Sequence, residues 1–178
     1  MFELDNLLFL WVNATTTSPA WLVPLARFAS QELPQWLIAG TIGAFVVGDA
    51  RIQRCVSRVL CAMLFAWLLA RLGQHFFPMP RPFSSGIGTV WLSHAQSAGF
   101  PSTHASVAFA FGATLAWSTR RRLLALAALG LASLIAWSRV SLGLHFPSDV
   151  LAGAGIGIAS AWLVGLVPLA TRKVHPAL

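Results

Sequence analysis

Charged residues are scarce in this chain, and their scarcity excludes most classes of soluble protein. Asp, Glu, Lys and Arg make up 10% of the 178 residues, whereas 57% of the residues are hydrophobic. Ordinary soluble domains carry roughly 25% charged residues. The mean hydropathy of +0.72 points the same way. We therefore expect an integral membrane protein.

Acidic residues are especially few, but the resulting positive charge does not indicate a nucleic-acid partner. Five acidic and twelve basic residues give a formal net charge of +7. The basic residues are spread between apolar runs, and no basic helix or aromatic-interleaved patch is present to grip a phosphate backbone. We therefore expect no binding to nucleic acid.

The sequence also lacks the patterns of a disulfide framework and of a signal peptide. Its two cysteines, Cys55 and Cys61, fall six residues apart in one predicted helix, where they do not face each other. Residues 1–17 contain Glu3 and Asp5 but no basic residue, whereas a signal peptide has a positive start before its apolar core. We expect two unbridged thiols and a retained N-terminus.

Long apolar runs are what the chain does have, and they predict an all-α, multi-pass membrane helix bundle forming a single domain over residues 1–178. A helix needs about 20 residues to cross the bilayer core. We expect about four spanning helices, built on residues 59–77, 105–117, 123–137 and 150–170. In the last of these, Gly153, Gly155 and Gly157 give a small-residue face for close helix packing.

Shorter helices are expected before residue 50. Residues 34–48 form one of them, and residues 1–17 and 19–32 look too short to span, so an interfacial and a spanning placement both stay open for these. The first segment favours the interface, with its acidic residues toward water. Its apolar residues recur at helical spacing, at Leu4, Leu7, Leu8 and Trp11.

Clusters of basic residues predict the orientation in the membrane. Arginines and lysine gather at residues 51–58, 120–122 and 172–173, which fall on one side of the bilayer if four helices span. Short loops rich in Lys and Arg stay in the cytoplasm. The other helix ends would then face the outside of the membrane.

Ionisable residues interrupt the apolar pattern at residues 138–149. Arg139, His145 and Asp149 follow one another at a break between two apolar runs, and such residues inside membrane proteins usually mark functional sites. Two upstream pieces, Arg81-Pro82 and residues 101–104, fall on the same predicted outer side. We expect the three pieces to form one site at the outer membrane boundary.

The polar groups in these pieces suit a phosphate. Guanidinium forks pair with phosphate oxygens, and the chain supplies two of them, from Arg81 and Arg139. A proline precedes Ser102 and Thr103 and fits the first turn of a helix, where backbone N–H groups lack intrahelical partners and point at an anion. We predict phosphate binding by these four residues.

Two histidines supply what phosphate-ester cleavage needs. One imidazole nitrogen attacks phosphorus and another protonates the leaving oxygen. We assign His145 as the nucleophile, with its ring oriented by Asp149 four residues later. His104 is assigned as the general acid for the leaving group and then as the base for the incoming water.

Less specific interpretations were weighed against this one. His104, His145 and Asp149 have side chains that also suit zinc, but two neighbouring arginines would repel a dication, so no metal is predicted. His75 and His94, taken alone, are typical of interfacial polar residues. Arg71 alone is typical of a side chain that snorkels from a helix end to water.

At this point the residues resemble a known family, the type 2 phosphatidic acid phosphatase superfamily, which also includes vanadium haloperoxidases. The resemblance rests on Arg81-Pro82, on Pro101-Ser102-Thr103-His104, and on Ser138-Arg139 followed by His145 and Asp149. It covers about residues 70–150. It implies phosphate binding by Arg81, Ser102 and Arg139, with Thr103 where glycine is common, acid–base work by His104, and a phosphohistidine at His145 supported by Asp149. It also implies that no metal or other cofactor is needed.

One position departs from the family pattern. The family has lysine seven residues before the arginine of Arg-Pro, and here that position is Gln74. Arg71, one helical turn earlier on the same face, or His75 is the candidate replacement. The chain is similar to the compact bacterial undecaprenyl pyrophosphate phosphatases of the bacitracin-resistance type, which share the aromatic approach to Arg-Pro-Phe and the Trp-Ser-Arg-Val segment.

The function predicted from this resemblance is that of a lipid phosphatase in the bacterial cytoplasmic membrane. It would remove the terminal phosphate of undecaprenyl pyrophosphate and return the carrier lipid to peptidoglycan synthesis. Aromatic residues at Phe76, Phe77, Trp91 and Phe100 would line the approach of the lipid. Two alternatives stay open: a phosphatase for phosphatidylglycerophosphate, phosphatidic acid or lipid A, and a non-catalytic lipid-phosphate transporter or scaffold.

Overall fold

The computed structural model describes residues 2–93 and 97–167, and all regular structure within them is helical. This confirms the all-α membrane class. In chain order the elements are α1 (Phe2–Val12), α2 (Leu22–Arg27), the π-helix η1 (Phe28–Glu32), α3 (Leu33–Val47), α4 (Ala50–Phe76), the 3-10 helix η2 (Pro82–Ser85), α5 (Thr103–Ser118), α6 (Arg122–Ser141) and α7 (Pro147–Leu166).

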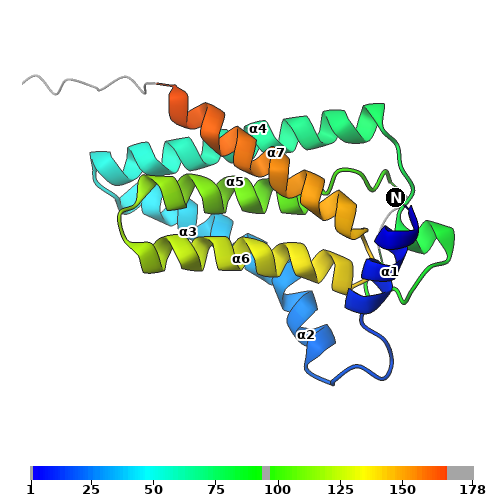
Figure 1. The fold of residues 1–178 in the computed structure, drawn as a ribbon. Helices are drawn as coiled ribbons and strands as arrows, with labels where there is room; N and C mark the ends of the chain where they lie inside the picture. Colours follow the sequence, from blue (N-terminus) through cyan, green and yellow to red (C-terminus); the bar gives the residue numbers. More distant parts are fainter. Residues whose placement is uncertain (1, 94–96, 168–178) are drawn as a thin grey trace, which may run out of the picture.

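The core of the fold is a bundle in which α5 lies between α4, α6 and α7 (Figure 1). Close packing of α5 on α7 depends on two glycines. A Cβ at Gly153 would lie 2.6 Å from the Ser102 carbonyl oxygen, and one at Gly157 would lie 2.4 Å from that of Ser106. Gly155, predicted to share this face, has no neighbour within 4 Å, because helical side chains share a face at spacings of three and four.

Within residues 2–93 and 97–167, three helices are long and apolar enough to cross a bilayer: α4, α6 and α7. The expected fourth, α5, has 16 residues and a length of about 24 Å. It is the shortest member of the bundle and is covered by its three neighbours.

The two ends of the bundle differ in charge. Asp49 begins α4 by accepting hydrogen bonds from the backbone N–H groups of Arg51 and Ile52, at 2.9 and 2.8 Å. This basic start lies at the same end as the turn between α5 and α6, where residues 120–122 lie (Figure 1). The three predicted site pieces, at Arg81, residues 101–104 and residues 138–149, lie at the opposite end, where α4 and α6 end and α5 and α7 begin. The third predicted cluster, residues 172–173, lies outside the described residues.

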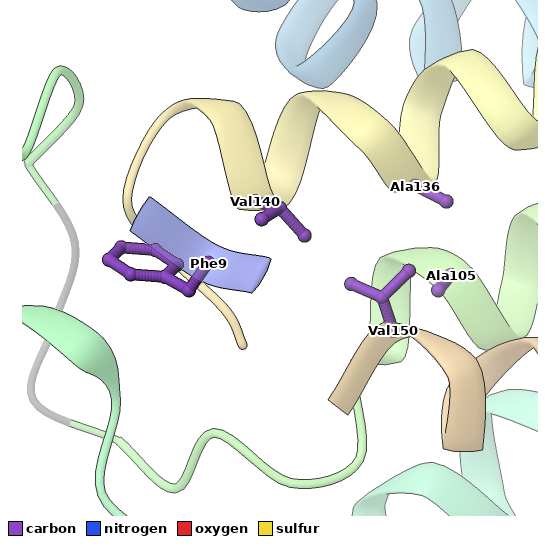
Figure 2. Close-up of a cluster of buried hydrophobic side chains, with 5 residues drawn as sticks. All are labelled: Phe9, Ala105, Ala136, Val140 and Val150. Atoms are coloured by element: carbon purple, nitrogen blue, oxygen red, sulfur yellow. The ribbon is translucent and has the colours of Figure 1, made fainter. Parts of the chain in front are cut away.

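Helix α1 packs across this second end. Phe9 is fully buried and lies against the cluster formed by Ala105, Ala136, Val140 and Val150 (Figure 2). The outer face exposes Leu4, Leu7 and Trp11, as an interfacial helix would. The prediction that both acidic residues face water is wrong for Asp5, whose carboxylate accepts hydrogen bonds from the backbone N–H and the hydroxyl of Ser148.

The two cysteines are unbridged, as predicted. The expected short helices also form, although the second is interrupted where α2 passes into the π-helix η1.

Candidate active site

The turn between α6 and α7 places His145 beside Asp149. Gly143 adopts a φ of 80°, a conformation that favours glycine, and a Cβ there would lie 2.3 Å from the Thr89 carbonyl oxygen. Helix α7 begins shortly afterwards, and the Asp149 carboxylate accepts a hydrogen bond of 2.9 Å from the backbone N–H of Phe146. This contact caps the helix start and fixes Asp149 on the side of His145.

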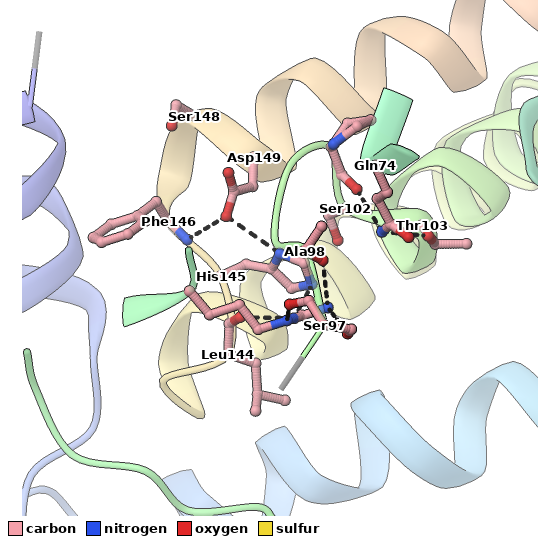
Figure 3. A network of polar contacts seen from close by, with 12 residues as sticks. Gln74, Ser97, Ala98, Ser102, Thr103, Leu144, His145, Phe146, Ser148 and Asp149 are labelled. Atoms are coloured by element: carbon pink, nitrogen blue, oxygen red, sulfur yellow. Dashed lines mark hydrogen bonds and ion pairs between the residues drawn. The ribbon is translucent and has the colours of Figure 1, made fainter. Parts of the chain in front are cut away.

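The hydrogen bonds of the His145 ring define its tautomer. His145 is 1% exposed. Its Nε2 lies 2.8 Å from Nη1 of Arg81, and its Nδ1 lies 3.3 Å from Oδ2 of Asp149 (Figure 3). Because a guanidinium only donates, Nε2 accepts, and the proton of a neutral ring therefore sits on Nδ1 and points at Asp149. A lone pair on Nε2 is the feature that a nucleophilic imidazole needs.

Arg81 is held by carbonyl oxygens around its guanidinium. Its Nε donates to the Ser97 carbonyl at 2.9 Å, Nη1 donates to that of Leu144 at 2.9 Å, and Nη2 donates to that of Ala98 at 3.1 Å. Burial lowers the pKa of Arg81 below its usual value, and the negative charge of Asp149 partly offsets this. The side chain stays cationic at neutral pH and is fixed against the nucleophilic nitrogen.

Two buried polar atoms near this group have no hydrogen-bond partner among the described residues. They are the hydroxyl oxygen of Ser102 and Nε of Arg139. The other end of the Arg139 guanidinium donates to the hydroxyl of Ser30 in η1. Unpaired buried donors are costly, so both atoms suit contact with the oxygens of an anion.

The backbone N–H of Ser102 is not available to an anion, contrary to the prediction. It donates to the Asp149 carbonyl oxygen at 3.0 Å, because the close α5–α7 packing brings the two helix starts together. The predicted anion contact from this N–H is therefore wrong, whereas the hydroxyl of the same residue remains suited to it.

A cavity of about 280 Å³ brings the predicted histidines together. His104 and His145 both line it, so an acid and a nucleophile face one space. Of the other predicted residues, Ser102, Arg139 and Asp149 are buried and are not among its lining residues, and His75 has its ring edge-on to Phe76. The remaining lining residues are Trp67, Arg71, Gln74, Arg81, Ser97 and Thr103.

Gln74 joins α4 to the start of α5. Its Nε2 donates to the Pro101 carbonyl at 3.0 Å and to Oγ1 of Thr103 at 2.9 Å (Figure 3). Its Oε1 accepts from Nη1 of Arg71 at 3.0 Å. The amide thus holds the Arg71 guanidinium at the cavity, in the neighbourhood where the family pattern has lysine.

Residues 55–172 match the model of the PAP2 superfamily. The chain belongs to this superfamily. As a PAP2 protein with a membrane-helix bundle, it is a membrane lipid phosphatase.

Three proteins are similar to this PAP2 chain over most of its length. The protein named "Putative undecaprenyl-diphosphatase YbjG" from Escherichia coli (strain K12) is 36% identical over 169 residues, which cover 92% of this chain and 84% of the relative. The crystal structure of Aquifex aeolicus LpxE has a TM-score of 0.74 at 23% identity, covering 90% of this chain and 94% of the other. That of a transmembrane PAP2 type phosphatidylglycerolphosphate phosphatase from Bacillus subtilis has a TM-score of 0.70 at 20% identity, covering 92% and 84%.

Zinc ligation does not fit this PAP2 site. Both nitrogens of His145 are engaged by Arg81 and Asp149, and within residues 2–93 and 97–167 no group of three His, Cys, Asp or Glu is placed to hold a metal ion. The donors present are those of an anion site.

Several residues that contribute to the PAP2 site could not be predicted from the sequence. Ser97, Ala98 and Leu144 act through backbone carbonyls, which every residue type has. Ser30 is recognisable only once η1 is packed beside Arg139. The contact made by Asp5 could have been suspected from the sequence, because Asp5 is one of only five acidic residues in the chain and lies in an apolar helix.

Proposed function

We propose that this protein removes the terminal phosphate of undecaprenyl pyrophosphate through a phosphohistidine at His145. The observation that carries the proposal is the state of the His145 ring, whose Nε2 accepts from Arg81 while Nδ1 faces Asp149. A basic nitrogen is thereby held ready beside a cation that binds phosphate oxygens. His104 lines the same cavity.

In the first step, Nε2 of His145 attacks the terminal phosphorus. The bond from that phosphorus to the bridging oxygen breaks, and His104 protonates the oxygen, which leaves on undecaprenyl phosphate. Nδ1 keeps its proton, and Asp149 stabilises the positive charge that develops on the ring. Arg81 Nη1 exchanges its contact with Nε2 for a phosphate oxygen, because both cannot use the same lone pair.

In the second step, His104 removes a proton from water, and the water oxygen attacks the phosphorus of the phosphohistidine. The bond between phosphorus and Nε2 breaks, inorganic phosphate leaves, and the original His145 is restored. The hydroxyl of Ser102 and Nε of Arg139, which are buried with no partner in the part of the chain that the structure describes, are assigned as donors to the transferring group in both steps. They stabilise its charge, as preorganised donors do in other enzymes.

Arg71 supports a diphosphate over a monoester as the substrate. It lines the catalytic cavity and is held by Gln74, so it adds a cation beyond those placed around His145. A diphosphate head has a second, non-scissile phosphate that needs such a partner. Its leaving group is a phosphate monoester, which leaves more readily than an alkoxide. The name of the Escherichia coli relative agrees with this choice.

Another lipid substrate remains as an alternative, whereas a non-catalytic role disagrees with membership of the PAP2 superfamily. A phosphatase for phosphatidylglycerophosphate, phosphatidic acid or lipid A would use the same histidines, but its scissile group would gain nothing from Arg71. A lipid-phosphate transporter or scaffold would bind with arginines alone and would have no use for a histidine whose nucleophilic nitrogen is oriented by a carboxylate. The Asp149 contact therefore favours an enzyme.

The proposed location is the bacterial cytoplasmic membrane, with the active site facing the periplasm or cell exterior. The site lies at the end of the bundle opposite the basic clusters at residues 51–58 and 120–122 (Figure 1), and basic loops stay in the cytoplasm. In this position the enzyme would recycle the carrier lipid for peptidoglycan synthesis and contribute to bacitracin resistance.

Phosphate release from a panel of purified lipid phosphates tests the substrate. We expect kcat/KM for undecaprenyl pyrophosphate to exceed that for phosphatidic acid at least about tenfold, a difference of about 1.4 kcal/mol in transition-state binding. The His145→Ala variant is the control for contaminating phosphatase. Equal efficiency toward phosphatidic acid or phosphatidylglycerophosphate in the same detergent would overturn the substrate assignment.

A further inference from the structure

The guanidinium of Arg139 is held by fewer contacts than that of Arg81. Arg81 donates to three backbone carbonyl oxygens and to the ring of His145. Arg139 is 2% exposed, and in the part of the chain that the structure describes its guanidinium has one hydrogen-bond partner. This partner is the hydroxyl oxygen of Ser30, which accepts from Nη1 at 2.5 Å. The position of the Arg139 cation therefore depends on a single side chain.

The charges around Arg139 make this contact important. Within residues 2–93 and 97–167 no carboxylate forms an ion pair with Arg139, and the positive charge of Arg81 repels it. Charges repel each other more strongly in a protein interior than in water. A buried guanidinium that faces a second cation would therefore move away from it unless an acceptor held it in place. Ser30, which is itself buried, is that acceptor.

A neutral partner suits an arginine that binds phosphate better than a carboxylate would. The hydroxyl oxygen of Ser30 accepts a hydrogen bond but carries no net charge, so the positive charge of Arg139 is left for the phosphate. Nε of the same guanidinium is buried without a partner among the described residues, which leaves a donor for an oxygen of the transferring group. A fixed side chain with an uncommitted donor is what a preorganised site requires.

Ser30 lies in the π-helix η1, which is one turn within a longer helical run. Helices α2, η1 and α3 follow one another with helical backbone angles at the junctions. At the end of η1 the backbone N–H of Leu33 donates to the carbonyl of Phe28, five residues earlier. Single π turns of this kind occur often at functional sites. Here the turn packs against α6, the helix that carries Arg139.

We propose that Ser30 is a positioning residue for catalysis, whose hydroxyl holds the Arg139 guanidinium so that Nε meets the phosphate group in transfer. The inference rests on the proposed function, in which Arg139 is assigned as a donor to that group. Ser30 does not touch the substrate and acts through Arg139. It lies outside residues 55–172, which match the superfamily model, so an N-terminal element contributes to the geometry of the site.

Binding of orthovanadate to the purified full chain in detergent tests this role. Vanadate adopts the trigonal-bipyramidal geometry of phosphate in transfer, so its Kd, measured by calorimetry, reports on donors that act in the transition state. Ser30→Ala should raise this Kd about tenfold, because a hydrogen bond to a charged group is lost. It should also lower kcat for undecaprenyl pyrophosphate about tenfold and leave KM unchanged.

The vanadate Kd separates positioning from a general effect on folding. A partly unfolded variant would lose active molecules and so kcat, but its folded molecules would bind vanadate with the wild-type Kd. Thr41→Val is the matched control, because Thr41 is also buried in this helical run and its hydroxyl donates to the carbonyl of Leu37 rather than contacting Arg139. It should leave the Kd unchanged. Equal Kd values for Ser30→Ala and Thr41→Val would overturn the proposal.

A double-mutant cycle shows whether Ser30 acts through Arg139. In an Arg139→Gln background, Ser30→Ala should cause no further rise in the vanadate Kd, because the guanidinium that it positions is absent. A further rise as large as that in the wild-type background would overturn the proposal.

The Arg139→Gln variant also separates this proposal from the proposed function. If Arg139→Gln alone binds vanadate with the wild-type Kd, the assignment of Arg139 as a phosphate donor in the proposed function fails. If Arg139→Gln weakens vanadate binding but Ser30→Ala does not, the positioning role of Ser30 fails and the proposed function stands.

Discussion

The geometry of the site depends on the guanidinium group of Arg81. It contacts the nucleophilic nitrogen of His145 and three carbonyl oxygens from two loops. Arginine has five N–H donors in a rigid fork, so one side chain fixes the His145 tautomer and ties residues 97–98 to the α6–α7 turn. When phosphate binds, its oxygens must replace some of the groups that Arg81 contacts. Arg81 therefore both stabilises the empty site and binds the substrate.

A prediction at the same scale concerns Arg71. Arg71→Gln should raise KM for undecaprenyl pyrophosphate about tenfold and leave KM for phosphatidic acid unchanged, because only the diphosphate presents a second phosphate to this cation. Steady-state phosphate release measures both. Arg54→Gln, at the far end of α4, is the matched control and should alter neither. A parallel rise for both substrates would show that Arg71 serves binding in general.

Side-chain chemistry explains which site residues the sequence could predict. The sequence predicts four of them, because ionisable residues within apolar membrane segments usually mark a functional site. These are Arg81, His104, His145 and Asp149. The carbonyl partners of Arg81 were not predictable, because the direction of these carbonyl groups depends on the fold of residues 97–98 and of the α6–α7 turn. The Ser102 amide was mispredicted because its partner, the Asp149 carbonyl, comes from a helix that is distant in sequence.

At the scale of elements, the contact between α5 and α7 aligns the two helix starts. Gly157→Ala should destabilise the bundle by about 1–3 kcal/mol, because its Cβ would lie 2.4 Å from the Ser106 carbonyl oxygen and backbone cannot rotate away. Gly155→Ala meets no atom and should be neutral or stabilising by up to about 1 kcal/mol. Thermal unfolding in detergent distinguishes them. Equal effects would contradict the assigned packing face.

For helix α1, the sequence pattern predicts the exposed face but not the contacts that attach the helix to the bundle. Its exposed Leu4, Leu7 and Trp11 were predictable from their spacing. Its attachment was not, because it depends on Asp5 reaching the start of α7 and on Asn13 donating to the carbonyls of Thr89 and Ser141. These polar contacts span more than 70 residues of sequence. A sequence pattern reports faces of helices, not their partners.

For the whole molecule, the separation of basic and catalytic ends predicts sidedness. In a background with Cys55 and Cys61 replaced by Ala, Ser84→Cys near the catalytic end should react with an impermeant maleimide from outside the cell. Ser118→Cys, at the end of α5, should react only after the membrane is opened. Labelling of both from one side would overturn the orientation that the basic residues predict.

The central claim is that the phosphate passes through Nε2 of His145, and trapping that intermediate tests it most directly. Undecaprenyl pyrophosphate with a labelled terminal phosphate is mixed with the enzyme and quenched in alkali, where phosphohistidine survives, before peptide mass spectrometry. The His104→Ala variant lacks the acid of the first step and the base of the second. Because a phosphate monoester leaves readily without protonation, whereas water needs the base to attack, the variant should retain more label than the wild type. The account predicts label on His145. Label on another residue, or none on His145 during normal phosphate release, would contradict it.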